Sequence, residues 1–280
     1  MKILVTGGSG YLGTHVRRFF NADDFSRRSQ RDILDQEDVS LVADYDVVIH
    51  LAAHLDKSFA AAEQSFRTNA EGTANLMRRM RPSSVFIYAS TKDVYGSFAD
   101  GYGEVPETCA TDYCGQSALE WSKLLGERYV DFYARANDVR ACIFRLSHIY
   151  ARPSEGNEHG FVTHYVESVK HRQPILLPAS GAPMRDILHV EDFSRACRAF
   201  IDSSLARGLY NLGGGRANSA SLRRIVETIG RMIEIPPVID ETAMIPPPVP
   251  LNYISDLSRI RKELGWQPTI GIEEGLRSLL

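Results

Sequence analysis

The sequence predicts an α/β fold, a doubly wound parallel Rossmann sheet with a smaller C-terminal lobe. Short, nearly continuous apolar runs alternate with amphipathic helical patterns through the first 150 residues. Runs that are apolar throughout are typical of parallel strands covered by helices on both faces. A glycine-rich turn also follows the first run and opens a helical segment, as in sheets of this class.

The expected elements alternate regularly along the first half. Strands are expected in KILVTG (2–7), in a segment ending in FSRRS (25–29), and in YDVVIHLAA (45–53), SVFIYAS (84–90) and RACIFRLSHIY (140–150). Helices are expected in THVRRFF (14–20), SFRTNAEGTANLMRRM (65–80) and ALEWSKLLGERYVDFYARA (118–136). Strand, helix and strand in series predict right-handed crossovers within one sheet.

The composition of the sequence changes after Tyr150, where polar loops and proline-rich stretches begin. We therefore expect a dinucleotide-binding domain over 1–150, with 185–212 returning to it. The smaller substrate-binding lobe is expected over 151–184 and 213–280. A chain of 280 residues suits this division.

Composition excludes several classes of function. The net charge of -3 does not indicate binding to nucleic acid or to an anionic membrane. The N-terminus lacks a signal-peptide pattern, and no apolar run approaches the roughly 20 residues of a spanning helix. The four cysteines form no CxxC pair and show no metal-ligand spacing, so we expect a cytoplasmic protein with buried or semi-buried thiols and no metal site.

The turn VTGGSGYLG (5–13) carries the clearest binding signal. Gly7, Gly10 and Gly13 give a tight turn, close approach of the backbone to a pyrophosphate, and close packing of helix on strand. The anion then lies on the N–H groups at the start of the helix. Because the pattern follows a strand and precedes a helix, it predicts a dinucleotide site.

The end of the second strand bears on the choice of cofactor. An acid there favours NAD, whereas a basic residue favours the 2′-phosphate of NADP. Asp23 and Asp24 come too early, and Ser26 stands where the acid is expected, followed by Arg27 and Arg28. Guanidinium groups suit a phosphate, so NADP is slightly preferred. The alternative, two arginines on a solvated loop, leaves NAD open.

Nine segments in order resemble the extended short-chain dehydrogenase/reductase family, in its NAD(P)-dependent nucleotide-sugar epimerase/dehydratase group. The resemblance covers the whole chain. Its segments are TGGSGYLG (6–13), RDILD (31–35), VIHLAA (48–53), TNAEGTANLM (68–77), ASTKDVYG (89–96), FRLSHIYARP (144–153), RDILHVEDFSRA (185–196), YNLGGG (210–215) and RIRKELGWQP (259–268).

The resemblance implies a nucleotide-activated sugar as substrate, and a homodimer as one expected assembly because the family often forms dimers. It implies cofactor contacts by Lys123 in SKLLGE (122–127) and by residues of these segments, namely Gly7, Gly10, Tyr11, Leu12, Gly13, Asp32, Ile33, Leu51, Ala52, Ala53 and Asn69. It implies substrate contacts by Thr91, by His148 in place of an asparagine, and by Arg185 on the diphosphate.

The same resemblance implies a catalytic Ser/Thr, Tyr and Lys. The tyrosinate accepts a hydroxyl proton, and the lysine lowers the tyrosine pKa. The Ser/Thr role carries over to Thr91, and the lysine role to Lys123 in SKLLGE (122–127). The tyrosine is then expected one helical turn before Lys123, where Leu119 stands. An alternative alignment uses Tyr113, but the residue four positions later is Ser117.

Leucine has no proton to exchange, so three neighbours are candidate substitutes. Tyr113 precedes the helix, and Lys92 with Asp93 follows Thr91 where the family's 4,6-dehydratases carry Asp and Glu. Lys92 and Asp93 are either an acid–base pair or a local ion pair.

Three functions remain open at this point. The first option is an epimerase or keto-sugar reductase with an atypical proton-transfer group. Alternatively, it is a non-redox or catalytically impaired homologue that acts as a scaffold or regulator. The third option is an epimerase of a keto-sugar whose nicotinamide is structural.

Overall fold

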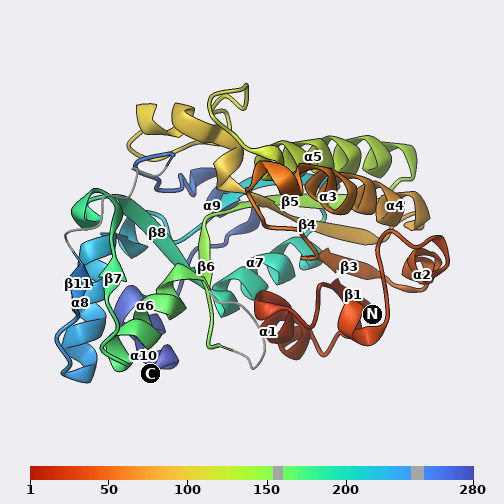
Figure 1. Ribbon diagram of the computed structural model, residues 1–280. Coiled ribbons are helices and arrows are strands. Elements are labelled where there is room, and N and C mark those ends of the chain that lie inside the picture. The colour runs from red at the N-terminus through yellow and green to blue at the C-terminus, as the bar shows by residue number, and fades with distance from the viewer. Residues whose placement is uncertain (154–159, 241–248) are drawn as a thin grey trace.

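The computed structural model describes residues 1–153, 160–240 and 249–280. Its largest layer is a six-stranded parallel sheet in the order β2-β1-β3-β4-β5-β9 (Figure 1). The strands are β1 (Ile3–Thr6), β2 (Asp23–Phe25), β3 (Val47–His50), β4 (Val85–Thr91), β5 (Arg140–Leu146) and β9 (Arg207–Leu212). The predicted doubly wound parallel sheet is confirmed, and its order reverses between β1 and β3, where such sheets bind ligands.

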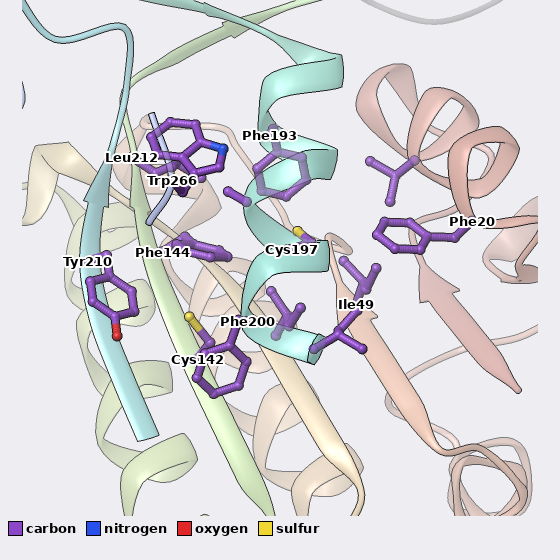
Figure 2. Close-up of a cluster of buried hydrophobic side chains, with 14 of the residues drawn as sticks. Phe20, Ile49, Cys142, Phe144, Phe193, Cys197, Phe200, Tyr210, Leu212 and Trp266 are labelled. Atoms are coloured by element: carbon purple, nitrogen blue, oxygen red, sulfur yellow. The ribbon is translucent and has the colours of Figure 1, made fainter. Parts of the chain in front are cut away.

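Helices cover both faces of this sheet. On one face lie α1 (Tyr11–Phe20) and α7 (Val190–Asp202), and on the other α2 (Gln36–Ser40), α4 (Gly72–Arg79) and α5 (Ala118–Ala136). Strand side chains alternate between the faces, so Val5 packs toward α7 and Leu4 toward α4. Figure 2 shows α7 presenting Phe193 and Phe200 to the strands.

The C-terminal lobe has its own small sheets and core. Its three-stranded sheet has the order β10 (Ser219–Ser221), β8 (Met184–His189), β6 (His148–Tyr150), and a second sheet pairs β7 (Ile175–Leu176) with β11 (Ile239–Asp240). The helices α6 (Phe161–Lys170), α8 (Leu222–Ile233) and α10 (Ile272–Leu279) pack into one apolar cluster there. Two further α-helices among the described residues are α3 (Ala62–Ser65) and α9 (Ser258–Leu264).

Two expected strand boundaries were wrong. The run 140–150 is not one strand, because Ser147 separates β5 of the large sheet from β6 of the small one. The second strand ends at Phe25, and Arg27–Ser29 form a 3-10 turn capped by Ser26. Within 185–212, α7 and β9 pack in or on the large sheet, whereas β8 pairs with β6 and β10.

The cysteines are free, as expected. Cys109, Cys142 and Cys197 are buried and Cys114 is partly buried. Figure 2 shows Cys142 and Cys197 within the apolar layer between β5 and α7. Over the described ranges no helix combines the length and apolarity needed to span a bilayer.

A buried ion pair fastens α5 to the sheet. Arg145 on β5 donates from Nε and Nη2 to the two carboxylate oxygens of Glu127, at 2.9 and 2.7 Å, and both side chains are 4% exposed. Ser90 Oγ and Tyr95 Oη complete the network, with Ser90 donating to Glu127 and Arg145 donating to Tyr95. Every charge in this site is therefore matched by a neighbour.

We predict that Glu127→Ala lowers the free energy of unfolding by about 3–5 kcal/mol, because it leaves the Arg145 guanidinium buried without its counter-charge. Urea denaturation checks this. The matched control is Asp131→Ala, which removes the exposed pair of Asp131 with Arg135 on the same helix and is expected to cost less than about 1 kcal/mol. Equal losses in the two variants would contradict the prediction.

Candidate active site

A cleft of about 1040 Å³ opens at the carboxyl ends of β1, β3, β4 and β5. The glycine-rich turn and the end of β2 line one part of it. Thr91, Leu119 and Lys123 line the middle, and the lobe contributes Gly160, Phe161 and Val162. The cleft therefore spans both units at the reversal of strand order, the position at which open α/β sheets bind ligands.

The glycine-rich turn fits a pyrophosphate. Gly7 has φ of +67°, and a Cβ on it would lie 2.8 Å from the Ala52 nitrogen. A Cβ on Gly13 would lie 2.1 Å from the Gly7 carbonyl oxygen. Gly10 is the N-cap of α1 and has no side chain that could cap the helix. A bound anion can take the place of that cap at the N–H groups of the first turn. Tyr11 and Leu12, both predicted cofactor contacts, also line the cleft.

The end of β2 supplies a basic rim. Ser26, Arg27, Arg28, Asp32 and Ile33 all line the cleft. Arg28 Nη1 donates to the Ser9 carbonyl at 3.2 Å, and Arg27 Nε lies 3.8 Å from an Asp32 carboxylate oxygen. Ser26 and Ser9 share a hydrogen bond between their hydroxyls at 2.7 Å.

Asp24 lies within β2, paired with Arg17 at 3.6 Å, and is not among the residues that line the cleft. Its carboxylate accepts from the hydroxyl of Ser26 at 3.0 Å and lies beside Gly8 of the glycine-rich turn, while Asp32 lines the cleft itself.

The loop after β3 forms one wall of the cleft. Leu51, Ala52, Ala53 and His54 line it. Asn69, predicted as a cofactor contact, lies behind this wall: it accepts from the His54 N–H at 2.8 Å and donates to the His54 carbonyl and to Ser122 Oγ, both at 2.9 Å. Asn69 therefore braces the loop against α5.

Leu119 and Lys123 lie one turn apart on α5 and both line the cleft. Leu119 is 6% exposed, so the position expected to hold the tyrosine is an apolar wall. Lys123 Nζ donates to the Ala89 carbonyl at 2.8 Å. Burial lowers the pKa of Lys123 to about 7, and Glu127 opposes this shift.

A charged network lies beside Leu119. Lys57 Nζ lies 2.9 Å from an Asp93 oxygen and 2.7 Å from a Glu120 oxygen, and Lys92 pairs with Asp93 from the other side. Lys57 and Asp93 line the cleft, whereas Lys92 is buried against the ring of Tyr253 and is not among the lining residues. Burial acts to raise the pKa of Asp93, but the two lysines hold it well below its usual value. Asp93 is therefore a stable anion and a weak base.

The remaining candidates are not gathered in one place. His148 lines the cleft, and burial together with the charges of Lys92 and Arg185 lowers its pKa well below the usual value, so it is neutral. Tyr113 is 71% exposed and does not line the cleft.

Arg185 is buried and also lies outside the cleft lining. Its guanidinium donates to the carbonyls of Met184, Pro250 and Leu251. In this arrangement it supports the chain around residue 250 instead of facing the cleft.

Sequence reasoning missed Lys57, His54 and Glu120. Lys57 and His54 lie in the loop just past VIHLAA, and Glu120 follows Leu119 directly. The sequence signal for Lys57 was an isolated positive charge a few residues after β3. Its carboxylate partners come from distant segments, so only the fold brings the three together.

The chain is similar to known proteins over its whole length. The family model described as "NAD dependent epimerase/dehydratase family" matches residues 3–213. A dTDP-glucose 4,6-dehydratase of Mycobacterium tuberculosis (strain H37Rv) is 31% identical, over 100% of this chain and 92% of its own. A CDP-paratose 2-epimerase of Salmonella typhi is 25% identical, over 100% of this chain and 98% of its own.

Two solved structures show the same fold. The UDP-glucose 4-epimerase of Thermotoga maritima with UDP-glucose has a TM-score of 0.84 at 23% identity, covering 100% of this chain and 97% of that one. RMD from Pseudomonas aeruginosa complexed with NADPH has a TM-score of 0.82 at 20% identity, covering 100% and 98%.

The depressed pKa of Lys123 predicts a pH dependence of stability. Between pH 7 and the lysine's usual pKa the unfolded chain binds the proton and the folded chain does not, so this residue makes stability rise with pH. From pH 7.5 to 9.5 wild type should therefore gain up to about 2 kcal/mol relative to Lys123→Met. Urea denaturation of both proteins at both pH values measures this, and an unchanged difference would contradict it.

Proposed function

This chain belongs to the NAD-dependent epimerase/dehydratase family, and from that membership we propose that it reduces a nucleotide-activated keto-sugar with NADPH. The observation that carries the direction of reaction is Leu119, which lines the cleft without any group that could take a proton from a hydroxyl. Relatives named dTDP-glucose 4,6-dehydratase and CDP-paratose 2-epimerase support the nucleotide-sugar class.

The charges near Leu119 also support reduction. Oxidation of an alcohol needs a base. Asp93 is a weak base because the neighbouring Lys92 and Lys57 lower the pKa of its carboxyl group. Reduction of a carbonyl instead needs positive charge and a proton for the new alkoxide. Lys57, which lines the cleft between two carboxylates, can supply both.

The cofactor would lie along the glycine-rich turn, with its pyrophosphate on the first turn of α1 and its adenosine end at Ser26, Arg27 and Arg28. When bound in its reduced form, it supplies the hydride. Lys123 would contact the nicotinamide ribose, and Thr91 would orient the substrate oxygen.

The basic rim predicts the choice of cofactor. Replacing both Arg27 and Arg28 by alanine should raise the Kd for NADPH about 10–100-fold, because charge-assisted hydrogen bonds to the 2′-phosphate are lost. The Kd for NADH should change by less than about threefold. Fluorescence titration measures both, with Arg216→Ala, which removes an exposed arginine outside this cleft, as the control. Equal losses for the two cofactors would favour NAD.

Turnover tests the function itself. Wild type with NADPH and dTDP- or UDP-linked 4-keto-6-deoxyhexoses should consume the reduced cofactor and form a hydroxyl-bearing sugar. Loss of absorbance at the reduced-nicotinamide band, with product identified by mass spectrometry, measures it.

The rival function, a scaffold that lost its tyrosine, is motivated by the same Leu119. It predicts that wild type is inactive with every substrate and that Leu119→Tyr gains activity. That pair of results would overturn the proposed reductase.

A further inference from the structure

We propose that Lys57 is the cation that contacts the substrate's carbonyl oxygen and protonates it after hydride transfer. This inference rests on the proposed reductase function and assigns its missing proton donor. Lys57 lines the cleft together with Thr91, Asp93 and Leu119, the group of residues around the position where the family tyrosine would stand.

The position of the Lys57 ammonium is fixed by two carboxylates from different elements. Asp93 follows β4 and lies 2.9 Å from Nζ, while Glu120 lies in the first turn of α5 and lies 2.7 Å from it. A lysine held from two sides loses the freedom that makes most surface ion pairs weak. It is thereby preorganised for one point in the cleft.

Glu120 is itself held in place. Its Oε2 accepts from the backbone N–H of Ser117 at 2.7 Å in the capping box of α5, which leaves Oε1 for Lys57. The Glu120 side chain is 4% exposed, so its charge is shielded from water on every side but that of Lys57. The residue that anchors Lys57 therefore directly follows Leu119 in the sequence.

The proton state of Lys57 suits an acid. Burial acts to lower its pKa, but Asp93 and Glu120 outweigh this and raise it above the usual value. It is therefore protonated throughout the neutral range, and an alkoxide is basic enough to take its proton. The same raised pKa makes Lys57 a poor base for the reverse reaction.

The step balances as follows. Hydride adds to the carbonyl carbon, the C=O π pair moves to oxygen, and this oxygen takes a proton from Lys57 Nζ. The cofactor leaves oxidised and the sugar leaves as an alcohol. Because the Lys57 side chain is 54% exposed, its neutral amine regains a proton from water before the next turnover.

Lys92 does not fill this role. Lys92 is buried, with 5% of its surface exposed. Its ammonium pairs with Asp93 and lies 5.1 Å from the centroid of the Tyr253 ring. Its contribution is to keep Asp93 ionised, so that Asp93 can hold Lys57.

The test compares Lys57→Met, Lys57→Arg and, as the matched lysine control on α9, Lys262→Met, using NADPH with dTDP- and UDP-linked 4-keto-6-deoxyhexoses. Lys57→Met should lower kcat by about 10²–10³-fold, the cost of removing one preorganised donor. The Kd for NADPH, measured by fluorescence, should stay within about twofold. Lys57→Arg, which keeps the charge, should recover part of the rate, and Lys262→Met should match wild type.

A pH profile separates proton donation from a merely structural role. Activity needs protonated Lys57, so kcat falls as pH rises through its pKa. Glu120→Gln keeps the capping bond but removes one carboxylate, so it should move this alkaline limb to lower pH. A Lys57→Met enzyme that keeps kcat within about threefold of wild type, or an alkaline limb that Glu120→Gln does not move, would overturn the assignment. Wild type that reduces no keto-sugar would overturn the proposed function, and this inference with it.

Discussion

The close approach of α5 to β4 is the constraint on which the site depends. A Cβ on Gly126 would lie 2.2 Å from the hydroxyl oxygen of Tyr88, so only glycine lets the helix come this near. One turn before Gly126, Lys123 donates a hydrogen bond to the Ala89 carbonyl. One residue after Gly126, Glu127 accepts hydrogen bonds from Ser90 and Arg145. A helix set further from the sheet would lose these contacts together.

That anchoring also determines where the first turn of α5 lies. Leu119 comes to the cleft because Lys123, one turn later, is fixed on β4, and Glu120 comes to Lys57 because Ser117 caps the helix. Asn69 adds a third tie, since it joins Ser122 to the loop that carries His54. The loop after β3, the end of β4 and the start of α5 are thus held as one rigid surface, which is the condition for preorganised catalysis.

The architecture could be predicted because its signals are local. Continuous apolar runs, amphipathic helical patterns and a glycine turn at a strand end each depend on neighbouring residues, and the structure agrees with them. The break at Ser147 could not be predicted, because β5 and β6 form one apolar run and only their different partner strands separate them.

The site divides in the same way. The glycine turn, Thr91 and Lys123 belong to recognisable segments and line the cleft. Tyr113 was a plausible donor by sequence distance, yet the loop turns it to solvent. Lys57 gave only a weak signal, an isolated cation just after β3, because its role depends on two carboxylates at sequence separations of 36 and 63 residues.

Leu119 stands where a catalytic base was expected, and its apolar side chain also lowers the polarity around the remaining charges. An apolar side chain that is 6% exposed excludes water from one side of the cleft, and a charge acts more strongly on a bound carbonyl where water is excluded. Burial lowers the pKa of Lys123 to about 7 against the opposing charge of Glu127, whereas Asp93 and Glu120 raise the pKa of Lys57. With no tyrosine at position 119, the positive charge in this part of the cleft therefore comes from Lys57. A carbonyl that is accepting hydride requires this, and an alcohol that is losing hydride does not.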